Sequence, residues 1–79
     1  MKLTDNSLMV WEFVKNNGGK VAISEIATAL GKSARSVGAN VTDLAKKGLA
    51  DRIVETVGDE EIKYVVLTAE GQSFVQGAE

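Results

Sequence analysis

The sequence contains no cysteine, no histidine and no proline. Without cysteine there is no disulfide and no thiolate metal site, and without histidine the commonest general base and metal ligand are missing. No pairing of a serine with a lysine or an aspartate stands out as a nucleophile with its base. We therefore expect no catalytic residues, no metal, no cofactor and no enzymatic activity.

Long hydrophobic runs and linkers are missing as well. The apolar stretch near the start is interrupted by Glu12 and Lys15, so it has neither the length of a membrane span nor the shape of a signal peptide. The 79 residues hold no Pro-rich or Ser-rich linker, and residues 1–79 are predicted to form one domain. An apolar share of 44% and a charged share of 25% are ordinary for a globular protein and favour the cytoplasm.

The charges are few and unevenly distributed. A net charge of −2 speaks mildly against nucleic-acid binding. However, residues 20–52 carry six basic and three acidic side chains, whereas residues 53–79 carry one basic and six acidic side chains. The middle of the chain is therefore basic and its end is acidic.

Residues 33–47 form the amphipathic helix around which the remaining chain is predicted to be organised. Ser33 is a good N-cap, and Gly48 is suited to the left-handed conformation that ends many helices. Apolar residues recur every three or four positions, so one stripe is predicted to be buried. The stripe consists of Ala34, Val37, Val41 and Leu44. The opposite face carries Arg35, Ala39, Thr42, Asp43 and Lys46, flanked by Ser36 and Asn40.

The flanking segments predict an α+β fold that is mostly helical. A first helix over 5–16 is capped by Thr4, and a second over 25–30 is capped by Ser24 after a short strand at 20–23. Residues 52–57 and 62–67 alternate as strands around a turn at 58–61, and a last short helix covers 69–76. The expected architecture is a three-helix core with a short β-strand, a β-hairpin and a short C-terminal helix. The buried face of the first helix consists of Ser7, Val10, Trp11 and Val14.

Two large apolar residues of the first helix, Met9 and Phe13, fall outside that buried face. A wide core contact would account for them. The alternative is a subunit interface, because extended exposed apolar patches are unusual on monomers. A homodimer formed through the first and last helices is accordingly an expectation from the sequence.

Specific residues at fixed places in this order add to the pattern. They are Ile23-Ser24-Glu25-Ile26-Ala27 with Leu30-Gly31, Lys46-Lys47-Gly48-Leu49 with Arg52, and Tyr64-Val65-Val66-Leu67-Thr68 with Glu70-Gly71. Over nearly the whole chain they resemble the winged helix-turn-helix domain, in particular that of MarR-like bacterial regulators. The resemblance implies that residues 33–47 are a recognition helix for the DNA major groove and that residues 53–66 form the wing.

The resemblance also implies a partner, double-stranded DNA, and a role in transcription regulation. The chemistry of the helix agrees in part, since Arg35 could contact guanine and Asn40 adenine. Ser33 and Ser36 could hold phosphate oxygens at the helix N-terminus. The DNA contacts implied by the resemblance are Lys32, Ser33, Arg35, Ser36, Ala39, Asn40 and Lys46, and Lys20 and Lys47 would add attraction that is independent of sequence.

Two features depart from the DNA-binding pattern. In the helix, Ala39 stands where relatives often carry a basic residue, and Asp43 lies on the predicted outer face. The hairpin turn holds Asp59, Glu60 and Glu61, where DNA-binding relatives present arginine or lysine. DNA would repel these carboxylates, and adjacent carboxylates in a turn are usually solvated rather than bound to a metal. An alternative function is therefore a winged-helix module for protein–protein interaction. Binding of single-stranded nucleic acid is a third hypothesis. Its bases would stack on exposed aromatic rings, and the candidates for this role are Trp11 and Tyr64.

Overall fold

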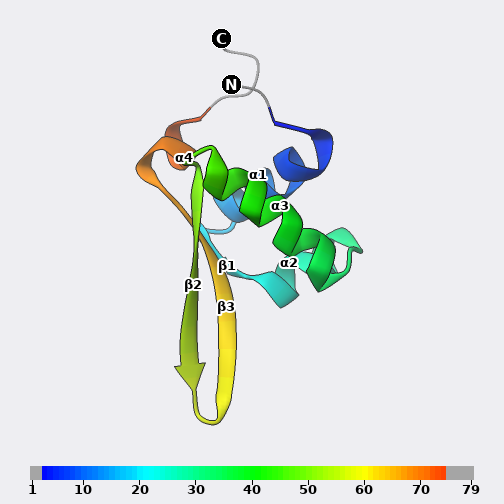
Figure 1. Cartoon of the computed structure of the whole chain (residues 1–79), viewed down its shortest axis with the longest axis vertical. Helices are drawn as coiled ribbons and strands as arrows, with labels where there is room; N and C mark the ends of the chain where they lie inside the picture. The colour runs from blue at the N-terminus through cyan, green and yellow to red at the C-terminus, as the bar shows by residue number, and fades with distance from the viewer. Residues whose placement is uncertain (1–2, 75–79) are drawn as a thin grey trace.

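A computed structural model describes residues 3–74, in which a long hairpin projects away from a group of packed helices (Figure 1). The strands form one antiparallel sheet in the order β1-β3-β2. None of the helices in this part of the chain combines the length and apolar character needed to cross a membrane. The elements are α1 (Asp5–Asn16), β1 (Lys20–Ala22), α2 (Ile23–Leu30), α3 (Ala34–Lys46), β2 (Ala50–Val57), β3 (Glu60–Leu67) and α4 (Ala69–Ser73).

The first helix, α1, has the bounds and the buried face that the sequence predicts. The side-chain oxygen of Thr4 accepts a hydrogen bond from the backbone N–H of Ser7 at 3.3 Å and so caps the helix. Val10 and Val14 are fully buried, and Trp11 is only 6% exposed. Trp11 is therefore a core residue, as predicted, and its ring is not available to stack on a base.

The second helix, α2, begins two residues earlier than predicted. Its N-cap is Ala22, whose backbone is extended because it still belongs to β1, and no side chain caps the helix. The prediction that Ser24 is the cap was wrong because Ile23 already turns into the core in the first helical turn, where it is 8% exposed. The helix ends at Gly31, which has the left-handed backbone conformation.

The third helix, α3, is bounded by the predicted caps. The side-chain oxygen of Ser33 accepts a hydrogen bond from the backbone N–H of Ser36 at 3.1 Å, and Gly48 has a φ of 74°. The predicted stripe is buried except at its first residue, Ala34, which is exposed. Ala34 lies in the first turn of the helix and lines an open groove toward β3 instead of the core.

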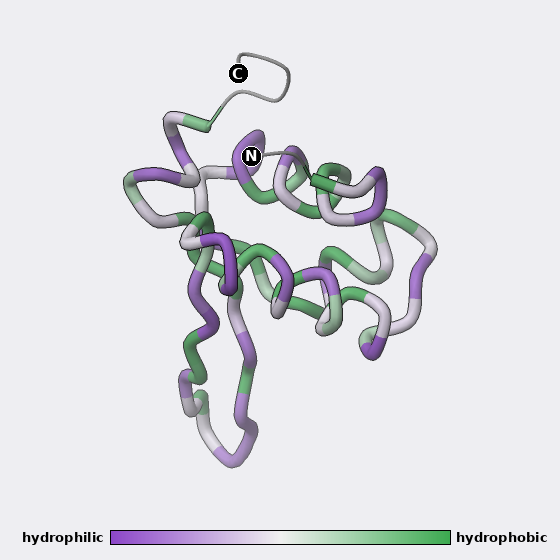
Figure 2. Tube along the Cα trace, turned by 45° about the horizontal axis from the view of Figure 1, so that its top comes forward, coloured by the Kyte–Doolittle hydropathy of each residue, from purple (hydrophilic) through white to green (hydrophobic). Residues whose placement is uncertain are grey.

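The hydrophobic core lies between the helices and one face of the sheet (Figure 2). Val37, Val41 and Leu44 of α3 have no exposed surface. They belong to one cluster with Val21 of β1 and Val65 of β3, which are paired in register. The outer side of α3 is thereby left as the surface that faces away from the core.

The hairpin is longer than the sequence predicts. Val57 pairs with Glu60, so the turn consists of Gly58 and Asp59 and not of residues 58–61. Gly58 has a φ of 63°, which suits the first position of a two-residue hairpin turn. Glutamate has a low strand propensity, but pairing with β2 draws Glu60 and Glu61 into β3.

The last helix, α4, ends at Ser73, because the backbone of Phe74 is extended. The predicted helical residues Val75 and Gln76 lie outside the described residues. The indole N–H of Trp11 donates a hydrogen bond to the backbone carbonyl of Gly71 at 2.7 Å, and the rings of Trp11 and Phe74 are T-shaped at 5.2 Å between centroids. These contacts join the end of the described chain to α1.

Candidate nucleic-acid interface

The outer face of α3 presents most of the residues that were predicted to contact DNA. Arg35, Ala39 and Lys46 are exposed, and so are Ser33 and Ser36 at its start. Thirteen residues give the helix a length of about 20 Å. A helix of this kind fits the width of a DNA major groove.

Lys32 and Asn40 are less accessible than the rest of this predicted set. Both are half-buried, and Nζ of Lys32 lies 3.5 Å from Oδ1 of Asn40. A bidentate contact to adenine needs both the oxygen and the nitrogen of the asparagine side chain. The oxygen of Asn40 has two lone pairs, so the long contact from Lys32 leaves it a second acceptor position for such a contact.

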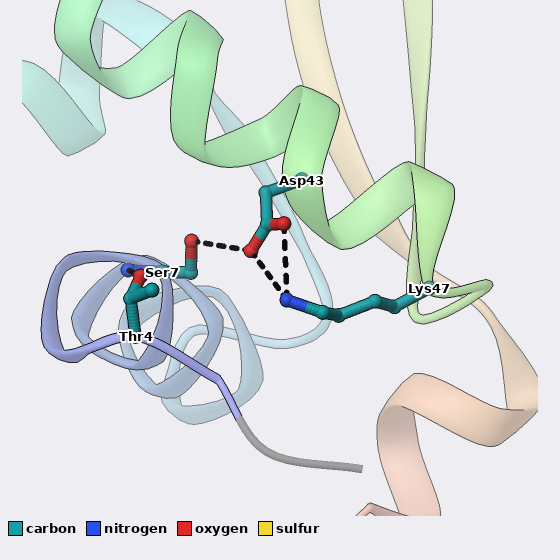
Figure 3. Close-up of polar contacts among 4 residues, drawn as sticks. All are labelled: Thr4, Ser7, Asp43 and Lys47. Atoms are coloured by element: carbon teal, nitrogen blue, oxygen red, sulfur yellow. Dashed lines mark hydrogen bonds and ion pairs between the residues drawn. The ribbon is translucent and has the colours of Figure 1, made fainter.

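The predicted position of Asp43 was wrong, and this removes one departure from the DNA-binding pattern. It does not lie on the outer face of α3 but on the flank that packs against α1 (Figure 3). Its Oδ2 accepts a hydrogen bond from the hydroxyl of Ser7 at 2.9 Å, and Nζ of Lys47 lies 2.9 Å from the same oxygen. Ser7 is only 1% exposed, so Asp43 satisfies a buried hydroxyl and would not repel a phosphate in the groove.

The hydrogen bonds from Lys47 and then from Ser7 hold the pKa of the Asp43 carboxyl below its ordinary value. A depressed pKa in the folded state stabilises the fold at any pH above the unfolded pKa of about 4, and that stabilisation is lost as the pH falls through the folded value. We therefore expect Asp43→Asn to destabilise the protein at pH 7 and to have less effect in acid. Denaturant titrations of both proteins from pH 7 to about pH 2 should show their free energies of unfolding converge; a gap that stays constant with pH would contradict this account.

Arg52 fixes the hairpin against α3, a contact that sequence reasoning missed. Its guanidinium Nη2 donates to the hydroxyl of Thr42 at 2.7 Å and to the backbone carbonyl of Gly38 at 3.1 Å. Thr42 was predicted to face outward and does, but its hydroxyl is engaged by Arg52. A single basic residue near the start of a strand gives no sequence signal for such a bridge.

Two lysines that were predicted to attract phosphates are also paired within the protein. Lys47 binds Asp43, as described above, and Nζ of Lys20 lies 2.9 Å from Oε2 of Glu55. The same ammonium group lies 4.7 Å from the centroid of the Tyr64 ring, which is half-buried. Lys20, Glu55 and Tyr64 thus interact on the face of the sheet that is turned away from the core.

The hairpin tip is acidic. Asp59, Glu60 and Glu61 are exposed, and none of them forms an ion pair within residues 3–74. A groove of about 320 Å³ separates this end of β3 from the N-terminal ends of α2 and α3. In the same part of the chain, no group of three or more His, Cys, Asp or Glu side chains is placed to hold a metal ion.

Comparison with solved structures places this arrangement among known folds. No protein-family model matches the sequence, and a search of the curated proteins finds no match. A transcriptional regulator homologue from Pyrococcus horikoshii OT3 is similar over 84% of this chain and 64% of its own, with a TM-score of 0.73 and 20% identity. NadR in complex with 4-hydroxyphenylacetate is similar over 87% of this chain and 48% of its own, with a TM-score of 0.73 and 26% identity. The fold is a MarR-like winged helix-turn-helix.

In this winged helix, α2 and α3 are the helix-turn-helix and the β2–β3 hairpin is the wing. RV1404 from Mycobacterium tuberculosis is similar as well, with a TM-score of 0.69 and 24% identity over 89% of this chain and 46% of its own. The chain thus spans between about half and about two thirds of the length of these three structures. The fold class and the resemblance predicted from the sequence are confirmed.

Proposed function

We propose that this winged helix binds double-stranded DNA and acts in the regulation of transcription. The observation that carries the proposal is the outer face of α3, where Arg35 and Lys46 are exposed and no other element of the described chain covers them. Support comes from the fold, which the chain shares with a structure described as a transcriptional regulator homologue. Residues 33–47 would enter the major groove as the recognition helix.

The proposed contacts divide into those that read bases and those that hold the backbone. Arg35 projects from the first turn of α3 and is suited to a bidentate contact with guanine. Ser33 and Ser36, with the backbone N–H groups at the start of α3, are suited to phosphate oxygens. Ala39 offers a methyl group for apolar contact with thymine. Lys32, Asn40 and Lys46 complete the proposed set.

The wing is expected to oppose this binding, because its tip carries carboxylates where DNA would bring phosphates. Replacing Glu60 and Glu61 by glutamine should raise the affinity for DNA about fivefold, since two exposed and salt-screened repulsions of about 0.5 kcal/mol each amount to roughly 1 kcal/mol. A variant with Glu12→Gln and Glu70→Gln removes the same charge away from the wing and should change the affinity much less. Equal affinities of wild type and wing variant would show that the wing stays clear of the duplex.

A DNA titration at two salt concentrations tests the proposal directly. Contacts to phosphates release counterions, so the association constant should fall steeply as salt rises. Absence of measurable affinity at low salt would refute the proposal. A homodimer formed through the first and last helices stays a prediction, and light scattering on the free protein tests it.

A further inference from the structure

We propose that a groove on the outer side of α1 receives a basic amphipathic helix of a partner protein. The groove lies between α1 and the end of α2, is open to solvent and has a volume of about 300 Å³. It is lined by Met9, Glu12, Phe13, Asn16 and Leu30. None of these residues belongs to the set proposed to contact DNA, so this surface is additional to the DNA interface and does not depend on it.

The floor of the groove is apolar and partly exposed. Met9 is 43% exposed, while Phe13 and Leu30 are partly buried at the edge of the core. A partner that covers these side chains would remove apolar surface from water. Grooves of this kind take the apolar side of an amphipathic helix, and the flexible Met9 side chain can adapt to its shape.

The charges beside the groove select a basic partner. Asp5 and Glu12 are seven residues apart and therefore lie on the same side of α1, about one turn before and one turn after Met9. The basic residue of α1, Lys15, lies elsewhere, with its Nζ 4.9 Å from the centroid of the Trp11 ring. Among the described residues 3–74, the groove side of α1 thus offers carboxylates and no ammonium group of the helix itself, which complements lysine or arginine on a partner.

The same charges disfavour a second copy of this chain, the alternative that the sequence left open for Met9 and Phe13, and the wing is a poorer site for a basic partner. A second copy bound across a two-fold axis would bring the carboxylates of Asp5 and Glu12 close to their own counterparts. The acidic wing offers a rival site for a basic partner, but its groove also contains Lys63 and the N-terminal end of α3. The ammonium group of Lys63 would repel a cationic helix in that groove, so such a helix is better matched at α1.

The probe for the experiment is a peptide of roughly 14 residues made only of leucine and lysine, with leucine at the spacing of one helix face. It is titrated into the isotope-labelled protein and followed by amide chemical shifts and fluorescence anisotropy. The largest shifts are expected at residues 9–16 and at Leu30. The double variant Met9→Ser/Glu12→Lys should bind the peptide about tenfold more weakly.

A matched control changes the wing in the same way. Val57→Ser/Glu61→Lys also replaces one exposed apolar residue and reverses one charge, and it should bind the peptide within about twofold of wild type. Equal losses in both variants would mean unspecific charge attraction and would overturn the proposal. It would also be overturned if light scattering showed a dimer that Met9→Ser/Glu12→Lys dissociates, because a second copy would then occupy the groove. Circular dichroism verifies that both variants are folded.

Discussion

Arg35→Ala is expected to weaken binding to double-stranded DNA by about 5- to 150-fold, the equivalent of roughly 1–3 kcal/mol. Arg35 is exposed on the first turn of α3, and within residues 3–74 no hydrogen bond or ion pair holds its guanidinium. Its loss would therefore remove a contact to DNA without disturbing the fold. Fluorescence anisotropy with a duplex selected from a random pool measures the effect.

Two further variants separate base reading from simple charge. Arg35→Lys keeps the positive charge but not the planar fork, so it should retain unspecific binding and lose discrimination between sequences. Lys15→Ala removes one positive charge from α1 and should leave the affinity within about twofold of wild type. If Lys15→Ala weakened binding as much as Arg35→Ala, net charge rather than α3 would account for the affinity.

Gly71→Ala is expected to lower the free energy of unfolding by about 3 kcal/mol, at the upper end of the usual cost of overpacking. A Cβ at this position would lie 1.8 Å from the backbone oxygen of Leu49 and 2.8 Å from its carbonyl carbon. A backbone neighbour cannot move aside by changing a rotamer, so α4 would have to shift. The shift would strain the hydrogen bond from Trp11 to the carbonyl of Gly71. Denaturant unfolding followed by the fluorescence of Trp11 measures the loss.

Gly38→Ala is the matched control for that substitution. Gly38 lies inside α3, and a Cβ there would meet no atom within 4 Å. Alanine is favoured over glycine in a helix interior, so this variant should be more stable than wild type by up to about 1 kcal/mol. Similar destabilisation at both positions would contradict the explanation from close packing.

The helix starts could be predicted where the signal is local. Thr4, Ser33 and Thr68 each accept a hydrogen bond from a backbone N–H three residues later, so each cap is contained within four consecutive residues. The start of α2 has no such side-chain cap, because burial of Ile23 decides where that helix begins. Prediction from sequence succeeded where the stabilising contact is short-range and missed this start, which depends on the core.

In the candidate site, too, local patterns could be predicted from the sequence and contacts between distant residues could not. The 3.6-residue period correctly placed Arg35 and Lys46 on the outer face of α3. It could not show that Asp43 turns toward Ser7, which is 36 positions away in the sequence. In the sequence Gly71 stood out only as part of the motif that carries the family resemblance, whereas its place in the fold is explained by the backbone of Leu49 directly beside it. Contacts between distant segments decide these cases, and a single sequence does not contain them.

The bridge from Arg52 to α3 bears on how the protein would approach a duplex. Because its guanidinium spans the hydroxyl of Thr42 and the carbonyl of Gly38, β2 and α3 are joined near the middle of the helix. These two hydrogen bonds hold the base of the wing against α3, so they help to set the angle between the wing and the helix. If α3 entered a major groove more deeply, the acidic tip would move together with it. The position of the acidic tip relative to the duplex would therefore depend on how deeply the helix lies in the groove.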